Sequence, residues 1–253
     1  MLIRNREEHI LQILKNNENI RVAELSSTLG VSRATIRRDL EKLHSIGKLE
    51  RVHGGAVFVE RATPELPVLQ RASVHAEEKR RIGLAAAEMV QEGDTIFIGS
   101  STTTLELARN LVDRKDITVI SNALTIINTL AQAKGISIIS IGGFLRPAEL
   151  TFIGHLAEQA LRELRPQKVF VGIRALSLAA GLTNEYLPEI STDRMIIQSG
   201  PEVILLADHS KFDKISTAFV APLTAVHKII TDSGVPFERI QEIRALGIEV
   251  LQV

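Results

Sequence analysis

Arginine side chains are concentrated in one short segment, where their spacing suits contact with a nucleic acid. From Ser32 to Leu40 the sequence reads SRATIRRDL, with three arginines and two hydroxyl side chains. Guanidinium groups bind phosphate oxygens and guanine edges, and hydroxyl groups also contact phosphates. We therefore expect this segment to contact DNA through Ser32, Arg33, Thr35, Arg37 and Arg38.

The residues around these arginines predict two helices joined by a tight turn. The first helix has apolar residues at helical spacing, namely Val22, Leu25 and Leu29. Gly30 permits the positive φ of the turn, and Ser32 is a typical N-cap for the second helix. The second helix carries one apolar stripe, formed by Ile36, Leu40 and Leu43. The arginines then lie on the exposed face, which suits insertion into a major groove.

A short β-hairpin is predicted after the second helix. Residues 48–57 read KLERVHGGAV, where apolar and polar residues partly alternate and a Gly-Gly pair provides a turn. Such a wing would carry three basic side chains to the phosphate backbone, namely Lys48, Arg51 and His53. The alternative is a helical hairpin with a solvated charged face. A winged helix-turn-helix explains the turn, cap, apolar stripe, basic face and wing together.

Hydroxyl side chains are concentrated at a second place. Residues 99–104 read GSSTTT, between an apolar run and an amphipathic segment that begins near Thr103. The N-terminus of a helix presents open backbone amides and partial positive charge, which bind phosphate and other anions. A simple N-cap requires only one hydroxyl group. We therefore expect an anion site formed by Ser100, Ser101, Thr102 and Thr103.

The chain beyond residue 93 alternates short apolar runs with amphipathic segments. The apolar runs lie at residues 95–98, 117–120, 136–139, 168–172, 203–206 and 228–230. This order predicts an α/β fold with a doubly wound, mainly parallel sheet and helices on both faces. Ligands of such sheets bind at the carboxyl ends of the strands.

Other polar residues and glycines follow these predicted strands. Asn122 could hydrogen-bond a sugar hydroxyl, whereas the Gly142-Gly143 pair could simply allow a tight turn. Arg174 and Lys211 could supply positive charge to an anionic ligand. An ion pair with Asp208 is the alternative for Lys211.

Both sets of motifs resemble those of the DeoR family of bacterial transcriptional regulators. VSRATIRRDL and RVHGGA carry the N-terminal resemblance, and TTTLELA, SN, GG, GLT and DHSKF extend it across nearly the whole chain. The resemblance implies a winged-helix domain that reads an operator, usually as a repressor of sugar catabolic genes. It also implies a C-terminal domain similar in fold to ribose-5-phosphate isomerase and coenzyme A transferases, which senses a phosphorylated sugar. By this resemblance the phosphate is held by Ser101, Thr102 and Thr103, with Asn122, Gly143 and Lys211 near the ligand.

The sequence departs from the family pattern at three places. Gly99-Ser100-Ser101 stands where many members have Asp-Ser-Gly, so a carboxylate suited to sugar hydroxyls is missing. Gln167 replaces a common aspartate, and Thr192 or Asp193 replaces a common lysine. These departures suggest a changed effector or one without the usual polyol contacts, such as another small anion.

Length and charge indicate two domains in an oligomer. The 253 residues suffice for one small and one medium domain. We expect a DNA-binding domain at residues 1–60, a linker stiffened by two prolines at 61–67, and an effector-sensing and oligomerisation domain at 68–253, beginning with a long helix over 68–91. Residues 1–61 hold eleven Lys/Arg against eight Asp/Glu. This small excess suggests that two DNA-binding domains act together in a homodimer or homotetramer.

Several function classes are disfavoured. There is no cysteine and no apolar run of membrane-spanning length, so we expect a cytoplasmic protein without disulfides or membrane contact. The seven histidines lack metal-ligand spacing, so we expect no metal and no cofactor besides the effector. A sugar-phosphate isomerase-like enzyme with an appended DNA-binding domain is the alternative function. Isomerisation requires a carboxylate base and usually a second acid or base. Asp208 is the one clear carboxylate at a strand end, and the sequence places no second acid beside it. We therefore expect no catalysis.

Overall fold

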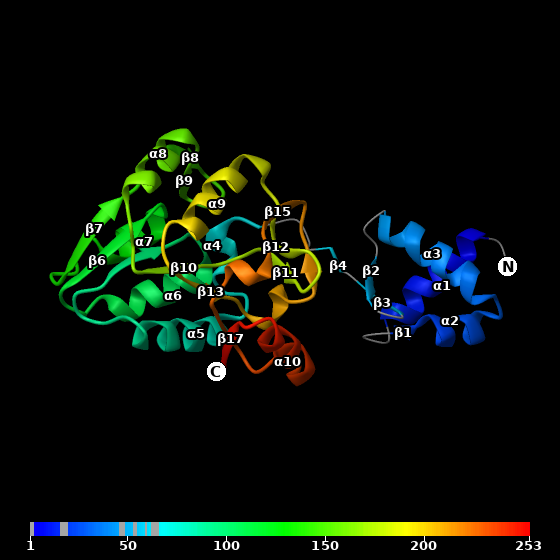
Figure 1. Cartoon of the computed structure of the whole chain (residues 1–253). Coiled ribbons are helices and arrows are strands. Elements are labelled where there is room, and N and C mark those ends of the chain that lie inside the picture. Colours follow the sequence, from blue (N-terminus) through cyan, green and yellow to red (C-terminus); the bar gives the residue numbers. More distant parts are fainter. Residues whose placement is uncertain (1–2, 16–19, 46–48, 53–54, 59, 62–65) are drawn as a thin grey trace. The chain divides into compact units, whose positions relative to one another are not determined.

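The computed structural model describes residues 3–15, 20–45, 49–52, 55–58, 60–61 and 66–253. The chain divides into two compact units (Figure 1). One unit comprises Met1–Arg61 with Asp213–Ile215, and the other comprises Ala62–Phe212 with Ser216–Val253. The first unit includes the parallel pair of β4 (Glu60–Arg61) and β14 (Lys214–Ile215).

The first unit contains the predicted helix-turn-helix and hairpin. Its helices are α1 (Ile3–Lys15), α2 (Val22–Leu29) and α3 (Arg33–Ser45). Its antiparallel sheet has the order β1 (Ile20–Arg21), β3 (Gly55–Phe58) and β2 (Leu49–Val52). Gly30 ends α2 with a left-handed φ of 64°, as the turn requires. The predicted apolar stripe of α3 is buried against Ile10, Leu14 and Leu25, so the opposite face of α3 remains available.

The second unit is built on a seven-stranded sheet with the order β17-β16-β13-β10-β5-β6-β7. All neighbouring strands are parallel. The strands are β5 (Thr95–Ile98), β6 (Ile117–Ser121), β7 (Ile136–Ser140), β10 (Lys168–Val171), β13 (Glu202–Leu206), β16 (Lys228–Thr231) and β17 (Glu249–Gln252). The first six coincide with the predicted apolar runs, so the α/β fold with a parallel sheet is confirmed.

Helices cover both faces of this sheet (Figure 1). The helices are α5 (Ala76–Glu88), α6 (Thr102–Leu111), α7 (Leu124–Leu130), α8 (His155–Glu163), α9 (Ile190–Gln198) and α10 (Phe237–Ala245). Ile96 and Ile98 pack with α5, α6 and α7, whereas Phe97 packs with α8, α9 and α10. Side chains alternate along a strand, so one strand supplies both cores. Among the described residues, no helix has the length and apolar character needed to cross a membrane.

The expected continuous helix over 68–91 is wrong. The segment forms two helices, α4 (Val68–Arg71) and α5, joined by a turn in which His75 has a left-handed φ of 52°. The Lys79 amine, buried in α5, donates to the Arg71 backbone carbonyl at 2.8 Å. This contact joins α5 to the end of α4 across the turn.

Shorter elements follow the carboxyl ends of the parallel strands. The hairpin of β8 (Phe144–Arg146) and β9 (Thr151–Ile153) comes directly after β7. An antiparallel sheet of β11 (Ala175–Ser177), β12 (Gly181–Asn184) and β15 (Ala218–Ala221) begins after β10. The 3-10 turns are η1 (Leu187–Glu189), η2 (His209–Lys211) and η3 (Leu223–Ala225). The hairpin, β12 and η1 provide walls for a pocket.

Candidate functional site

The exposed face of α3 carries the predicted DNA-contacting side chains. Ser32, Arg33, Arg37 and Arg38 are exposed, and Thr35 is half-buried. The Thr35 backbone amide donates to Ser32 Oγ at 3.2 Å, so Ser32 caps α3 and fixes where the helix begins. The arginine side chains are therefore held on a rigid element.

The wing is only partly described. Arg51 lies on β2, is exposed, and has its Nη1 3.8 Å from Oε1 of Glu41 on α3. Exposed pairs at this distance contribute little to stability, so the guanidinium can exchange Glu41 for a phosphate. Lys48 and His53 lie outside the described residues.

A buried ion pair that the sequence pattern did not reveal joins α1 to α3. Arg6 Nε lies 2.6 Å from Asp39 Oδ2, and Arg6 Nη2 lies 3.0 Å from Asp39 Oδ1. The Asp39 carboxylate raises the pKa of Arg6. Asp39 follows the exposed arginines of α3 in sequence but points to the interior. Its position three residues after the buried Ile36 is the signal that could have predicted this.

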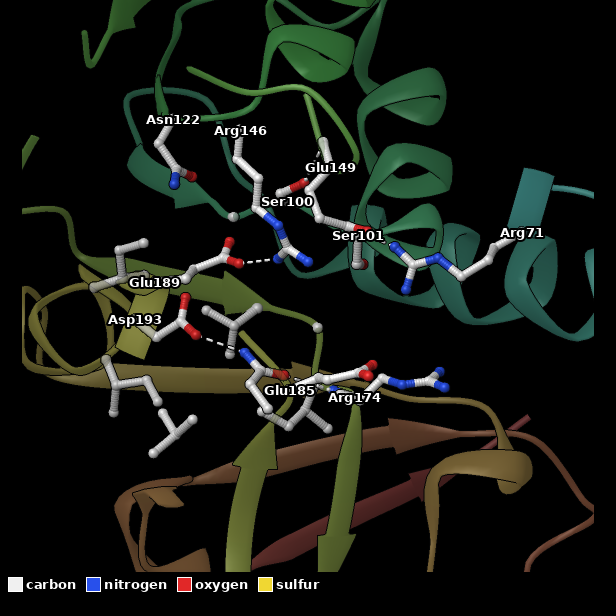
Figure 2. Close-up of a pocket in the computed structure, with 18 residues that line it drawn as sticks. Arg71, Ser100, Ser101, Asn122, Arg146, Glu149, Arg174, Glu185, Glu189 and Asp193 are labelled. Carbon is white, nitrogen blue, oxygen red and sulfur yellow. Dashed lines mark hydrogen bonds and ion pairs between the residues drawn. The ribbon is translucent and has the colours of Figure 1, made fainter. Parts of the chain in front are cut away.

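A pocket lies at the carboxyl ends of β5, β6 and β10 in the second unit (Figure 2). It holds about 710 Å³ of empty space, counting the solvent at its mouth. Polar and charged lining residues are Arg71, Ser100, Ser101, Asn122, Arg146, Glu149, Arg174, Asn184, Glu185, Glu189 and Asp193. Four of these, namely Ser100, Ser101, Asn122 and Arg174, belong to the site predicted from the sequence.

The N-terminus of α6 forms one wall of this pocket. The Thr104 backbone amide donates to Ser101 Oγ at 2.9 Å, so Ser101 is the N-cap. Among the described residues, the backbone amides of Thr102 and Thr103 donate to no protein acceptor, as expected in a first helical turn. The Thr102 and Thr103 side chains are buried and are not part of the lining. Their backbone amides have no protein acceptor and directly follow Ser101, which does line the pocket.

Asn122 offers an acceptor to the pocket. Its Nδ2 donates to Thr151 Oγ1 at 2.9 Å and to the Phe152 carbonyl at 3.1 Å. Because a carbonyl can only accept, these bonds fix the orientation of the amide. Oδ1 is buried without a protein donor in the part of the chain that is described, so a ligand hydroxyl would satisfy it.

Gly143 and Lys211 lie outside the pocket lining. Gly143 has a φ of 146°, and a Cβ there would lie 2.7 Å from the Ile153 carbonyl oxygen, so this glycine allows close packing of the hairpin. Burial lowers the pKa of Lys211 to about 8, and the positive charge of Arg174 adds to this effect. Asp208 opposes the shift, although no direct ion pair joins Lys211 to Asp208 among the described residues.

Charged residues from the walls, which strand periodicity could not locate, already pair with one another. Arg146 pairs with Glu189, and its Cζ lies 4.4 Å from the ring centroid of Tyr186. Arg71 pairs with Glu149. An incoming anion would therefore compete with carboxylates for both arginines. Among the described residues, no group of three or more His, Cys, Asp or Glu side chains could hold a metal ion.

The departures from the family pattern differ in their surroundings. Gln167 Oε1 accepts from the Thr95 amide at 2.5 Å, and Thr192 Oγ1 accepts from the Gly154 amide at 3.0 Å. Both side chains support the backbone outside the lining. Gly99 and Asp193, in contrast, line the pocket. The Asn184 Nδ2 donates to Asp193 Oδ2 at 2.5 Å.

An arginine-bearing helix-turn-helix, joined in one chain to a parallel α/β unit with a charged pocket, defines a DNA-binding regulator with a small-molecule sensor. Two family models match the chain: the DeoR-like helix-turn-helix domain over residues 6–62, and the DeoR C terminal sensor domain over residues 74–233. The chain therefore belongs to the DeoR family of transcriptional regulators.

Two known regulators are similar to this chain over most of its length. The transcriptional repressor AccR of Agrobacterium fabrum is 38% identical, over 91% of this chain and 90% of that protein. The regulator IolR of Bacillus subtilis is 34% identical, over 95% of this chain and 94% of that protein. Ribose 5-phosphate isomerase A from Methanocaldococcus jannaschii aligns at 16% identity and a TM-score of 0.41, over 55% of each chain. That last likeness is too distant to indicate an activity.

Proposed function

We propose that this regulator represses carbohydrate catabolic genes and leaves its operator when a phosphorylated sugar or related anion occupies the pocket. The open amides at the N-terminus of α6 carry this proposal, because they directly follow Ser101, which lines a pocket that also contains Arg71 and Arg174. The amides of Thr102 and Thr103 would hold the phosphate, and Asn122 Oδ1 would accept from a sugar hydroxyl. Lys211 would add positive potential from behind the lining.

The DNA-binding part of the proposal rests on α3. Arg33, Arg37 and Arg38 would enter the major groove, while Arg51 on the wing would bind a phosphate. A homodimer or homotetramer in the cytoplasm would bind paired half-sites, one DNA-binding domain to each. Residues 1–60 would form that domain, residues 61–67 the linker, and residues 68–253 the sensor.

Arg38→Ala tests the recognition helix. Removing one base or phosphate contact should weaken operator binding by about 1–3 kcal/mol, or roughly 5- to 150-fold, without changing effector binding. Arg80→Ala is the matched control, because Arg80 is an exposed arginine on α5 of the sensor unit. Fluorescence anisotropy with labelled operator measures the operator affinity of both variants. Equal affinity of Arg38→Ala and the wild type would refute the assignment of α3.

Thr102→Pro tests the anion site. Proline fits the first position of a helix but has no amide hydrogen, and Ser101 has the extended conformation that a following proline requires, with φ −168° and ψ 164°. Thr102→Ala is the matched control, since it keeps the amide and removes only the hydroxyl. Phosphorylated sugars should raise the melting temperature of the wild type and of Thr102→Ala, and their unphosphorylated counterparts should not. A full response by folded Thr102→Pro would exclude this site.

A further inference from the structure

Helix α4 brings an arginine into the pocket from the segment that follows the proposed linker. It comprises only Val68–Arg71, and its last residue lines the pocket beside Ser100, Ser101 and Glu149 (Figure 2). Among the lining residues, Arg71 is the first that follows Arg61, where the N-terminal part of the DNA-binding unit ends. A change at Arg71 therefore has a short covalent route along the chain to the segment that carries the helix-turn-helix.

Polar contacts hold α4 to the loop between β8 and β9. The Arg71 guanidinium pairs with the Glu149 carboxylate, and their side chains are only 15% and 7% exposed. The Val68 amide donates to the Ala148 carbonyl at 2.9 Å. Both contacts link α4 to residues 148–149, so the position of α4 depends on that loop.

The same loop adjoins the anion site. Ser100 Oγ donates to the Glu149 carbonyl at 3.2 Å, directly before the N-cap of α6. Glu149 lines the same pocket as Ser100 and Ser101, so an anion at the N-terminus of α6 would share the pocket with the Glu149 carboxylate and would be repelled by it. Arg71 lies beside both the proposed anion position and the Glu149 carboxylate. Its positive charge also contributes to the lowered pKa of Lys211. The anion and Glu149 thus compete for one guanidinium group.

We propose that Arg71 couples the pocket to the operator: a bound phosphate draws the Arg71 guanidinium away from Glu149, and α4 moves with it. This inference rests on the proposed function, because it requires an anion at α6. Since α4 begins directly after the linker, its displacement changes the constraint on the chain that leads to the DNA-binding unit. The ligand-free pair of Arg71 and Glu149 favours operator binding, and its loss disfavours it.

Glu149→Gln tests this coupling without any ligand. The substitution removes the competing charge and releases Arg71, so operator affinity should fall about tenfold without added anion, within the usual range of allosteric coupling. Asp94→Asn is the matched control. It breaks the ion pair with Lys168, whose side chains are 13% and 17% exposed, at the opposite end of the strands from the pocket. Wild-type operator affinity of Glu149→Gln, or an equal loss in Asp94→Asn, would overturn the proposal.

Hydrogen exchange of the full-length wild type distinguishes the proposed anion site from the proposed coupling through Arg71. Inorganic phosphate is the probe, and chloride at equal ionic strength is the reference. Phosphate should slow exchange at residues 100–104 and accelerate it at residues 66–75. Glu149→Gln should show the faster exchange at 66–75 without phosphate. Slowing at 100–104 with no change at 66–75 would overturn the coupling and leave the anion site intact. No change at either segment would overturn both.

Discussion

Replacing Asp39 with alanine would leave the Arg6 guanidinium between α1 and α3 without the carboxylate that accepts two of its hydrogen bonds. The two side chains are only 11% and 8% exposed, so water cannot fully replace the lost partner. Removing one partner of a buried ion pair costs about 3–5 kcal/mol. We expect the lower end, about 3 kcal/mol, because one edge of the pair still reaches solvent.

This loss can be measured in the DNA-binding unit by native-state hydrogen exchange. At about 1.4 kcal/mol for each tenfold change, exchange in peptides from α1 and α3 should accelerate roughly 100-fold in Asp39→Ala. Glu41→Ala is the matched control, since Glu41 lies on the same helix with a side chain that is 71% exposed. Its removal should change stability by no more than about 1 kcal/mol.

The double variant Arg6→Met/Asp39→Leu distinguishes a lost partner from a lost charge. Apolar residues of similar volume can replace a buried ion pair without loss of stability. The double variant should therefore recover most of the exchange protection that Asp39→Ala loses. Unchanged exchange in Asp39→Ala would refute the structural role of this carboxylate.

Two further predictions concern the sensor unit. Because burial lowers the pKa of Lys211 from 10.5 to about 8, the unfolded state binds more protons between these values, and stability against urea should rise from about pH 8 to 10.5. Lys211→Met should remove this rise; an unaltered pH profile would contradict it. Gly143→Ala should lower unfolding free energy by about 1–3 kcal/mol, because of its φ of 146° and the Ile153 carbonyl 2.7 Å from the new Cβ. Gly142→Ala is the control, because a Cβ at Gly142 meets open space. Its melting temperature should change little, and an equal fall in melting temperature in both variants would contradict this explanation.

Periodicity predicted the parts of the fold in which burial follows from sequence spacing alone. The apolar runs located six parallel strands, and the stripe with Gly30 and Ser32 located the helix-turn-helix. The edge strand β17 was not predicted, because only Val250 of its four residues is buried. The break between α4 and α5 was not predicted either. It contains no glycine or proline, and the contact that bridges it, from Lys79 to the Arg71 carbonyl, joins residues that no helical or strand spacing pairs.

The sequence predicted only those pocket residues that directly follow the carboxyl ends of the parallel strands. The rule that ligands bind at carboxyl ends of parallel strands located Ser100, Ser101, Asn122 and Arg174. It could not locate Arg146 or the remaining charged residues, because hairpins and 3-10 turns carry them back over the strand ends. Which loops fold over a sheet depends on tertiary packing, which no periodicity within a segment encodes.

The family departures can now be separated by what their side chains do. Gln167 and Thr192 each accept from a backbone amide, so their substitutions concern support of the backbone. Gly99 and Asp193 line the pocket, so they bear on the ligand. A Cβ at Gly99 would make only ordinary contacts, the nearest at 3.5 Å from Val171, so the missing side chain leaves usable space rather than relieving a clash. Differences in effector among members of this family should therefore follow positions 99 and 193, and the amides of α6 that we propose to bind the anion should be common to them.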